Sequence, residues 1–123
     1  MAIAVIAVIG VFFAGIGVYA LAAPAALIQP FGITLEQPAS RSEVRAVYGG
    51  FGLAIAGVLA YAAVAGGDVR TGILITVGAA LAGMAFGRIV SAIVDERTAF
   101  YPNWFYFLVE AIAAAALFAI SAR

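Results

Sequence analysis

The sequence of 123 residues contains no cysteine, no histidine and no lysine. Without cysteine there are no disulfides and no thiolate nucleophiles, and without cysteine and histidine the usual zinc and haem ligands and histidine-based triads are excluded. All six basic residues are arginines, and six acidic residues balance them to a formal net charge of zero. A neutral chain of this kind offers no basic surface for nucleic acid. We therefore expect no metal, no cofactor and no nucleic-acid partner, and we assign no catalytic residue.

Charge is scarce and apolar residues are abundant. Only 10% of the residues are charged, 67% are hydrophobic, and the mean hydropathy is +1.19. A soluble domain is typically about 25% charged and about 45–50% apolar. A small soluble fold cannot bury so much apolar surface, so the composition predicts an integral membrane protein. The exclusive use of arginine, together with many Ala and Gly residues, is typical of a GC-rich bacterial genome and points to the bacterial inner (plasma) membrane.

Four long apolar segments predict four membrane-spanning helices. They cover about residues 2–23, 42–66, 69–94 and 103–122, and each is long enough to cross a hydrocarbon core of about 30 Å. Continuous apolar runs without alternation favour helices over barrel strands. The predicted fold is an all-α, integral membrane, antiparallel four-helix bundle that forms a single domain over residues 1–123. We expect the first segment to remain uncleaved, because residues 2–13 lack the basic residues of a signal peptide.

The helix ends carry local signals. Ser42, Asp68 and Asn103 are each placed to cap the amino end of the second, third and fourth helix. The Gly66–Gly67 turn predicts a tight hairpin between helices two and three. The connection from Pro24 to Arg41 is rich in apolar residues and is expected to lie on the membrane surface.

Four spans divide the polar ends into two faces. The loop face holds the connections 24–41 and 95–102, and the terminal face holds both termini and the turn at 66–69. Arginines near helix ends are Arg41, Arg45 and Arg97 on the loop face and Arg70 and Arg123 on the terminal face. The two faces have nearly equal numbers of arginines, so the positive-inside rule gives almost no preference for either orientation. The long connection 24–41 resembles a segment that covers the outer face of a membrane protein, which favours cytoplasmic termini.

Arg88 and Glu110 are ionisable residues inside two of the apolar segments. A charge inside the bilayer costs a few kcal/mol or more unless it is paired or hydrated. Arg88 lies seven residues before Asp95 and Glu110 lies seven residues after Asn103, so each is roughly 10 Å inside the loop-face end of its helix. Because helices three and four are antiparallel, the two side chains fall at the same depth and are expected to form an ion pair.

Helical spacing places further polar residues beside this pair. Ser91 follows Arg88 by three residues, and Asn103 and Tyr106 precede Glu110 on one stripe. Arg45 and Tyr48 share a stripe near the same end of helix two. The glycines beside them have no side chains, so the helix is thinner next to the predicted site. The predicted ligand-binding site comprises Arg45, Tyr48, Arg88, Ser91, Asn103, Tyr106 and Glu110.

Two structural interpretations compete with a binding site. A buried Arg–Glu pair can serve only to fix the register of two helices, with little net stability. Small residues recur every four positions, as in Ala46–Gly50–Ala54 and Ala79–Gly83–Gly87–Ser91. Such stripes let helices approach closely in lipid, and they predict a compact bundle that could also form homo-oligomers.

The string Arg45-Ala46-Val47-Tyr48-Gly49-Gly50, with Gly87-Arg88 and the later Asp95, resembles an uncharacterised bacterial family, number 4345 of the domains of unknown function. The resemblance covers nearly the whole chain, including an acid in the last helix at Glu110. It implies a small protein with four membrane helices and brings no established activity. Family members often have a Gly-containing turn where this chain has Asp95-Glu96-Arg97-Thr98. The architecture also resembles, more loosely, that of DoxX-like four-helix proteins.

Three functions are compatible with these residues. The first is binding of a lipid headgroup, a small amphiphile or a protein partner at the Arg/Glu/Tyr cluster. The second is a small oligomeric proton-coupled transporter in which Glu110 carries the proton. The third is a membrane enzyme, which would have to use Glu110, Tyr48 or Tyr106 as acid or base. The shortage of catalytic residue types argues against the enzyme, so membrane lipids or a small amphiphile are the favoured partners.

Overall fold

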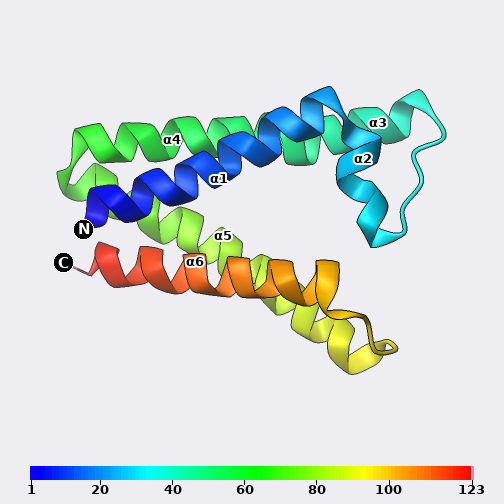
Figure 1. Cartoon of the computed structure of the whole chain (residues 1–123). Coiled ribbons are helices and arrows are strands. Elements are labelled where there is room, and N and C mark those ends of the chain that lie inside the picture. Colours follow the sequence, from blue (N-terminus) through cyan, green and yellow to red (C-terminus); the bar gives the residue numbers. More distant parts are fainter. Residues whose placement is uncertain (123) are drawn as a thin grey trace. The chain divides into compact units, whose positions relative to one another are not determined.

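The computed structural model describes residues 1–122 as a helical chain without strands (Figure 1). Four helical segments are long and apolar enough to cross a membrane: Ala2–Ala22, Pro38–Ala65, Gly67–Val94 and Phe100–Ser121. This confirms the predicted class, an all-α membrane protein with four spanning helices. Arg123, which the orientation argument placed on the terminal face, lies outside the described residues.

The chain folds as two compact units, each containing two antiparallel spans (Figure 1). Unit 1 comprises Met1 and Ile3–Val64, and unit 2 comprises Ala2 and Ala65–Arg123. The first span of unit 1 is α1 (Ala2–Ala22), and its second is formed by α3 (Pro38–Val44), a π-helical turn η2 (Arg45–Gly50) and α4 (Phe51–Ala65). Unit 2 contains α5 (Gly67–Val94), a second π-helical turn η3 (Phe100–Trp104) and α6 (Phe105–Ser121).

The predicted start of the second span is wrong by four residues. The helix begins at Pro38, and Ser42 lies inside α3 instead of capping it. Proline suits the first helical position because the backbone N–H that it lacks would have no partner there. The residue before it, Gln37, is extended and makes no side-chain capping bond. Pro38 therefore determines this helix start.

The other two predicted caps are also wrong. Asp68 lies in the first turn of α5, where its charge complements the helix dipole, but Gly66 is the N-cap. The φ of Gly66 is +67°, a left-handed value that favours glycine, and the turn from α4 to α5 depends on it. Asn103 lies inside η3, and no side chain caps that turn.

Glycines let α1 and the second span of unit 1 approach closely. A Cβ on Gly17 would lie 3.0 Å from the carbonyl oxygen of Gly49 and 3.0 Å from the amide nitrogen of Leu53. A Cβ on Gly52 would lie 3.2 Å from the carbonyl oxygen of Phe13. These are backbone atoms, which cannot move away by a change of rotamer as a side chain can. Gly49 and Gly52, which the sequence placed beside the polar site, therefore serve as the contact surface for α1.

The connection between the two spans of unit 1 is partly folded. It contains a short helix α2 (Pro24–Ile28) and a 3₁₀ turn η1 (Gln29–Phe31). Leu27 and Ile28 are buried in a cluster with Ala20 of α1 and Val44 of α3. The apolar side chains of this connection thus partly cover the loop-face end of unit 1, whereas Ile33 stays about half exposed.

Unit 2 is a hairpin in which α5 and α6 pack together. Its buried apolar side chains are Leu74, Val77, Leu81 and Ala85 of α5 and Ala114, Leu117 and Ile120 of α6. The two helices approach closely at Gly78, where a Cβ would lie 3.0 Å from the Phe118 ring. At Gly83 and Gly87 a Cβ would meet no neighbouring atom within 4 Å in the described chain. The predicted Ala79–Ser91 stripe is therefore not the surface against which α6 packs.

Candidate functional site

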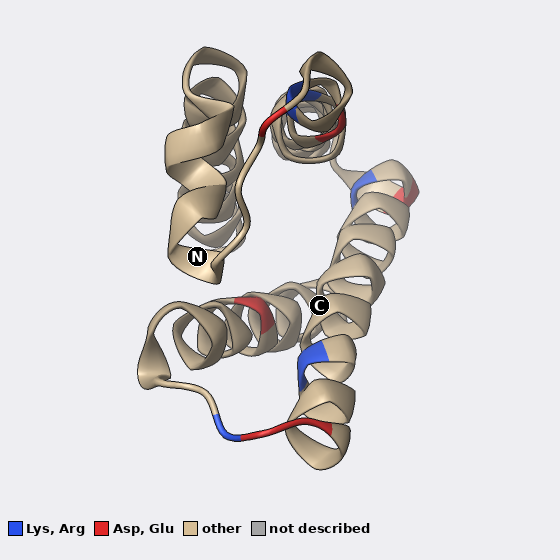
Figure 2. Cartoon of the chain, turned by 90° about the vertical axis from the view of Figure 1, so that its right-hand side faces the viewer, with Lys and Arg blue, Asp and Glu red and all other residues tan. Residues whose placement is uncertain are grey.

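Arg88 of α5 and Glu110 of α6 form a bidentate ion pair. Arg88 Nε donates to Glu110 Oε1 at 2.8 Å, and Arg88 Nη2 donates to Oε2 at 2.9 Å. Figure 2 colours the basic and acidic positions along the ribbons of the chain. The structure thus confirms the pairing that the antiparallel register predicted.

Because the Glu110 side of this ion pair is buried, its carboxylate depends on the arginine for its counter-charge. The side chain of Glu110 is 5% exposed and that of Arg88 is 21% exposed. Glu110 is the one charged residue among the described residues that is buried. A buried carboxylate requires a partner, and the planar guanidinium supplies two parallel N–H donors that match both of its oxygens.

Asn103 completes the coordination of the arginine. Arg88 Nη1 donates to Asn103 Oδ1 at 3.1 Å. Asn103 belongs to η3, at the beginning of the fourth span. Its amide oxygen thus accepts a bond from α5 and does not cap its own helix. The sequence selected the correct residue for the cluster and, separately, assigned it a capping role that it does not have.

Tyr106 places its ring beside the cation. The Arg88 Cζ lies 5.8 Å from the centre of the Tyr106 ring, within the range of a cation–π contact. Tyr106 also packs edge-on against Phe105, with ring centres 5.1 Å apart, and lies 6.2 Å from the ring of Tyr101. These aromatic side chains form the loop-face border of the cluster. We refer to Arg88, Asn103, Tyr106 and Glu110 as the arginine cluster.

Ser91 lies on the same helix but outside the hydrogen bonds of the arginine cluster. It is exposed, and its carbonyl oxygen accepts the Asp95 N–H at 2.9 Å, which ends α5. No hydrogen bond joins its hydroxyl to the cluster among the described residues. Its role as a ligand-binding residue stays a prediction.

Arg45 and Tyr48 belong to unit 1, where both lie in the π-helical turn η2. Arg45 Nε donates to the carbonyl oxygen of Leu21 at 3.0 Å. That carbonyl belongs to the last turn of α1, which has no basic residue of its own. A cation there satisfies a carbonyl that has no helical partner and complements the negative end of the helix dipole. Arg45 therefore stabilises the end of α1, and Tyr48 is partly exposed beside it.

Sequence reasoning missed this helix-end contact. The unsatisfied end of α1 could be recognised from the sequence, because a span without a terminal cation stops at Pro24. The donor could not, since it lies 24 residues further along the chain. Both π-helical turns were missed as well, although Arg45–Gly50 was the most distinctive string in the sequence.

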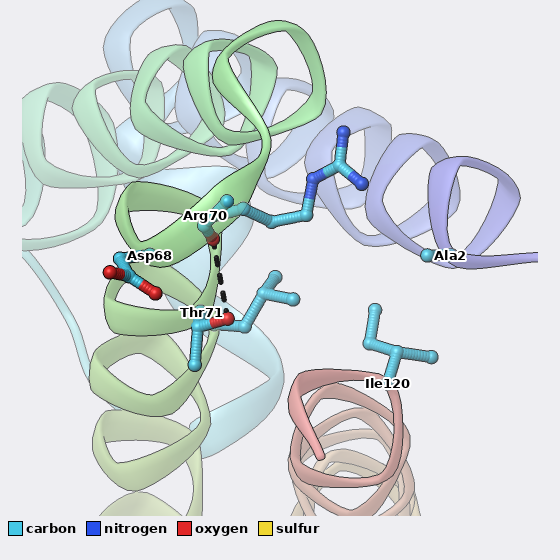
Figure 3. Close-up of a pocket in the computed structure, with 7 residues that line it drawn as sticks. Ala2, Asp68, Arg70, Thr71 and Ile120 are labelled. Carbon is cyan, nitrogen blue, oxygen red and sulfur yellow. Dashed lines mark hydrogen bonds between the residues drawn. The ribbon is translucent and has the colours of Figure 1, made fainter. Parts of the chain in front are cut away.

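A separate hollow lies at the amino end of α5, with a volume of about 320 Å³ (Figure 3). Asp68, Arg70 and Thr71 line it together with Ile120 of α6, and the Thr71 hydroxyl donates to the Gly67 carbonyl. Arg70 precedes Arg88 by 18 residues on the same helix, a separation of about 27 Å. The hollow is thus distinct from the arginine cluster. Within the described residues, no acidic group of three or more could hold a metal ion.

The fold and the cluster define a class: an all-α membrane protein whose two carboxyl-terminal spans are joined by a buried arginine–glutamate pair. The chain belongs to the family described as a domain of unknown function (DUF4345), which matches residues 1–121. No curated protein and no solved structure matches it. The family resemblance of the sequence is thus confirmed, and the looser resemblance to DoxX-like proteins stays a prediction.

Proposed function

We propose that this protein binds the polar headgroup of a membrane amphiphile at the arginine cluster. The observation that carries the proposal is the bidentate Arg88–Glu110 pair between two membrane spans, with Glu110 buried and Arg88 partly exposed. Ionisable groups inside membrane spans are uncommon and usually mark binding or transport sites. A partly exposed guanidinium can contact a headgroup, whereas a fully covered pair would only join two helices.

The depth of the cluster suits a headgroup. Arg88 lies six residues before the end of α5, which corresponds to about 9 Å of helix. This depth is close to the boundary between the acyl chains and the headgroups, where an amphiphile presents its polar atoms. Tyr101, which packs against Phe105 at the border of the cluster, is of a residue type that favours this interface.

The same geometry favours binding over proton-coupled transport. A proton carrier must release and regain its proton during a transport cycle. Both carboxylate oxygens of Glu110 accept hydrogen bonds from one arginine, so the carboxylate is held in a fixed ion pair between two spans and neither oxygen lies open to a passing substrate. Enzymatic activity has no further support, because the cluster contains no nucleophile next to a base.

We also propose the membrane, the orientation and the partners of this protein. The four apolar spans support a multi-pass membrane protein, and the arginine-only, Ala- and Gly-rich composition is our reason for proposing the bacterial inner membrane. We place its termini in the cytoplasm and expect membrane lipids as its partners, with homo-oligomers as a further form. Ser91, Arg45 and Tyr48 remain proposed outer members of the site.

The test is native mass spectrometry of the protein purified in mild detergent. We expect a copurifying lipid on the unaltered protein and about a tenfold smaller adduct in Arg88→Lys, because lysine keeps the charge and loses the planar donor array. Arg70→Lys makes the same chemical change at the other end of α5 and should retain the adduct. Thermal unfolding in the same detergent checks that both variants are folded.

The proposal is contradicted if the unaltered protein carries no lipid. It is also contradicted if folded Arg88→Lys and Arg70→Lys proteins carry equal adducts, since the bound lipid would then be held elsewhere.

A further inference from the structure

The guanidinium of Arg88 is engaged at each of its three nitrogens. Nε and Nη2 donate to the carboxylate of Glu110, and Nη1 donates to Asn103 Oδ1. A headgroup that binds Arg88 must therefore replace one of these partners or share a nitrogen with it. The chemistry of the partners decides which headgroup can do so.

Glu110 is the partner that resists replacement. Its side chain is 5% exposed, so removing the arginine from it would leave a buried carboxylate without its counter-charge. An anionic headgroup would also approach that carboxylate, and like charges at short range repel each other. The pair is therefore a poor receptor for an anion even though it contains an arginine.

The charges around the cluster also disfavour an anionic headgroup. The loop that follows α5 carries Asp95, Glu96 and Arg97, and Figure 2 shows red and blue positions along this connection. Together with Arg88 and Glu110, the loop-face end of unit 2 has two basic and three acidic residues. Recognition of anionic lipids usually depends on clusters of several basic residues, and this end of the unit has a net negative charge.

Asn103 is the partner that can be replaced. Its bond to Arg88 is a single one of 3.1 Å to a neutral amide, and its side chain is partly exposed. It belongs to a π-helical turn at the start of the fourth span, and such turns recur at functional sites. A displaced amide leaves no buried charge behind.

We infer that the arginine cluster selects a headgroup without net negative charge, and that an acceptor oxygen of this headgroup takes the place of Asn103 Oδ1 on Arg88 Nη1. This inference rests on the proposed function and names its ligand class: zwitterionic or uncharged polar amphiphiles. Asn103 then acts as a specificity residue that competes with the ligand. Its removal strengthens binding, whereas removal of an ordinary ligand contact weakens it.

The test is a competition in detergent between phosphatidylethanolamine and phosphatidylglycerol with identical acyl chains, added in equal amounts to the full-length protein and read by native mass spectrometry. We expect the zwitterionic adduct to exceed the anionic one. In Asn103→Ala the zwitterionic adduct should rise about fivefold, the equivalent of one competing hydrogen bond. In Asn103→Asp it should fall, because a second carboxylate holds Nη1 more tightly.

Thr76→Ala is the control, since the Thr76 hydroxyl donates to the carbonyl of Gly72 within its own helix, and its adducts should match those of the unaltered protein. A preference for phosphatidylglycerol overturns the inference and leaves the proposed function standing. An unchanged or smaller zwitterionic adduct in folded Asn103→Ala overturns the competing role of Asn103. Absence of both adducts from the unaltered protein contradicts the proposed function, and the inference fails with it.

Discussion

At the scale of single residues, Arg88 and Glu110 depend on each other. Arg88→Met leaves the Glu110 carboxylate buried without its partner, so we expect the free energy of unfolding to fall by about 3–5 kcal/mol. The double variant Arg88→Met/Glu110→Met replaces the pair with apolar side chains and should recover most of this loss. Reversible unfolding in detergent micelles measures both effects.

The double variant also separates structure from function. If the pair only fixes helix register, the double variant should retain any copurifying lipid. If the pair binds a headgroup, the double variant is as stable as the unaltered protein and has lost the lipid. A double variant that is less stable than Arg88→Met alone would show that the cost of burying Glu110 has been overstated.

The core of this site could be predicted from the sequence because it depends on register alone. Arg88 and Glu110 lie at equal distances from a shared loop, so any antiparallel hairpin brings them together. Asn103 and Tyr106 follow from helical spacing on the same span. Arg45 could not be placed in this way, because its bond to Leu21 depends on how a folded connection returns the chain to α1.

At the scale of helices, the contact between the two spans of unit 1 depends on Gly17. An alanine Cβ there would press on the backbone of Gly49 and Leu53 at 3.0 Å, so Gly17→Ala should destabilise the protein by about 1–3 kcal/mol through overpacking. Gly15→Ala is the matched control in the same helix, because its Cβ would meet no packed neighbour within 4 Å among the described residues. Thermal unfolding of the two variants should differ clearly, and equal melting temperatures would contradict the close approach.

The helix boundaries show what apolar patterns reveal and what they omit. The lengths of the four spans follow from hydrophobic runs, which record how much chain must lie in lipid. The starts at Pro38 and Phe100 extend beyond those runs, because proline at the first position and a π-helical turn allow a helix to begin among polar or aromatic residues. Neither feature changes hydrophobicity, so neither was visible in the pattern.

At the scale of the whole molecule, each unit is a pair of antiparallel spans. Four successive membrane crossings would place the connections 24–37 and 95–99 on one side of the membrane and the turn at Gly66 on the other. The class of the fold was predictable because a bilayer admits few solutions for four apolar segments. The orientation was not, because the arginines near the two faces are almost equal in number.

The absence of cysteine makes this topology directly testable. Thr34→Cys, Thr98→Cys and Asp68→Cys each introduce a single thiol at an exposed position. With cytoplasmic termini, a membrane-impermeant maleimide should label Cys variants at positions 34 and 98 in intact cells and the variant at position 68 only after permeabilisation. The reverse pattern would invert the orientation and leave the four spans intact. Labelling of all three positions from the same side would contradict a membrane crossing between them, because α5 alone separates position 68 from position 98.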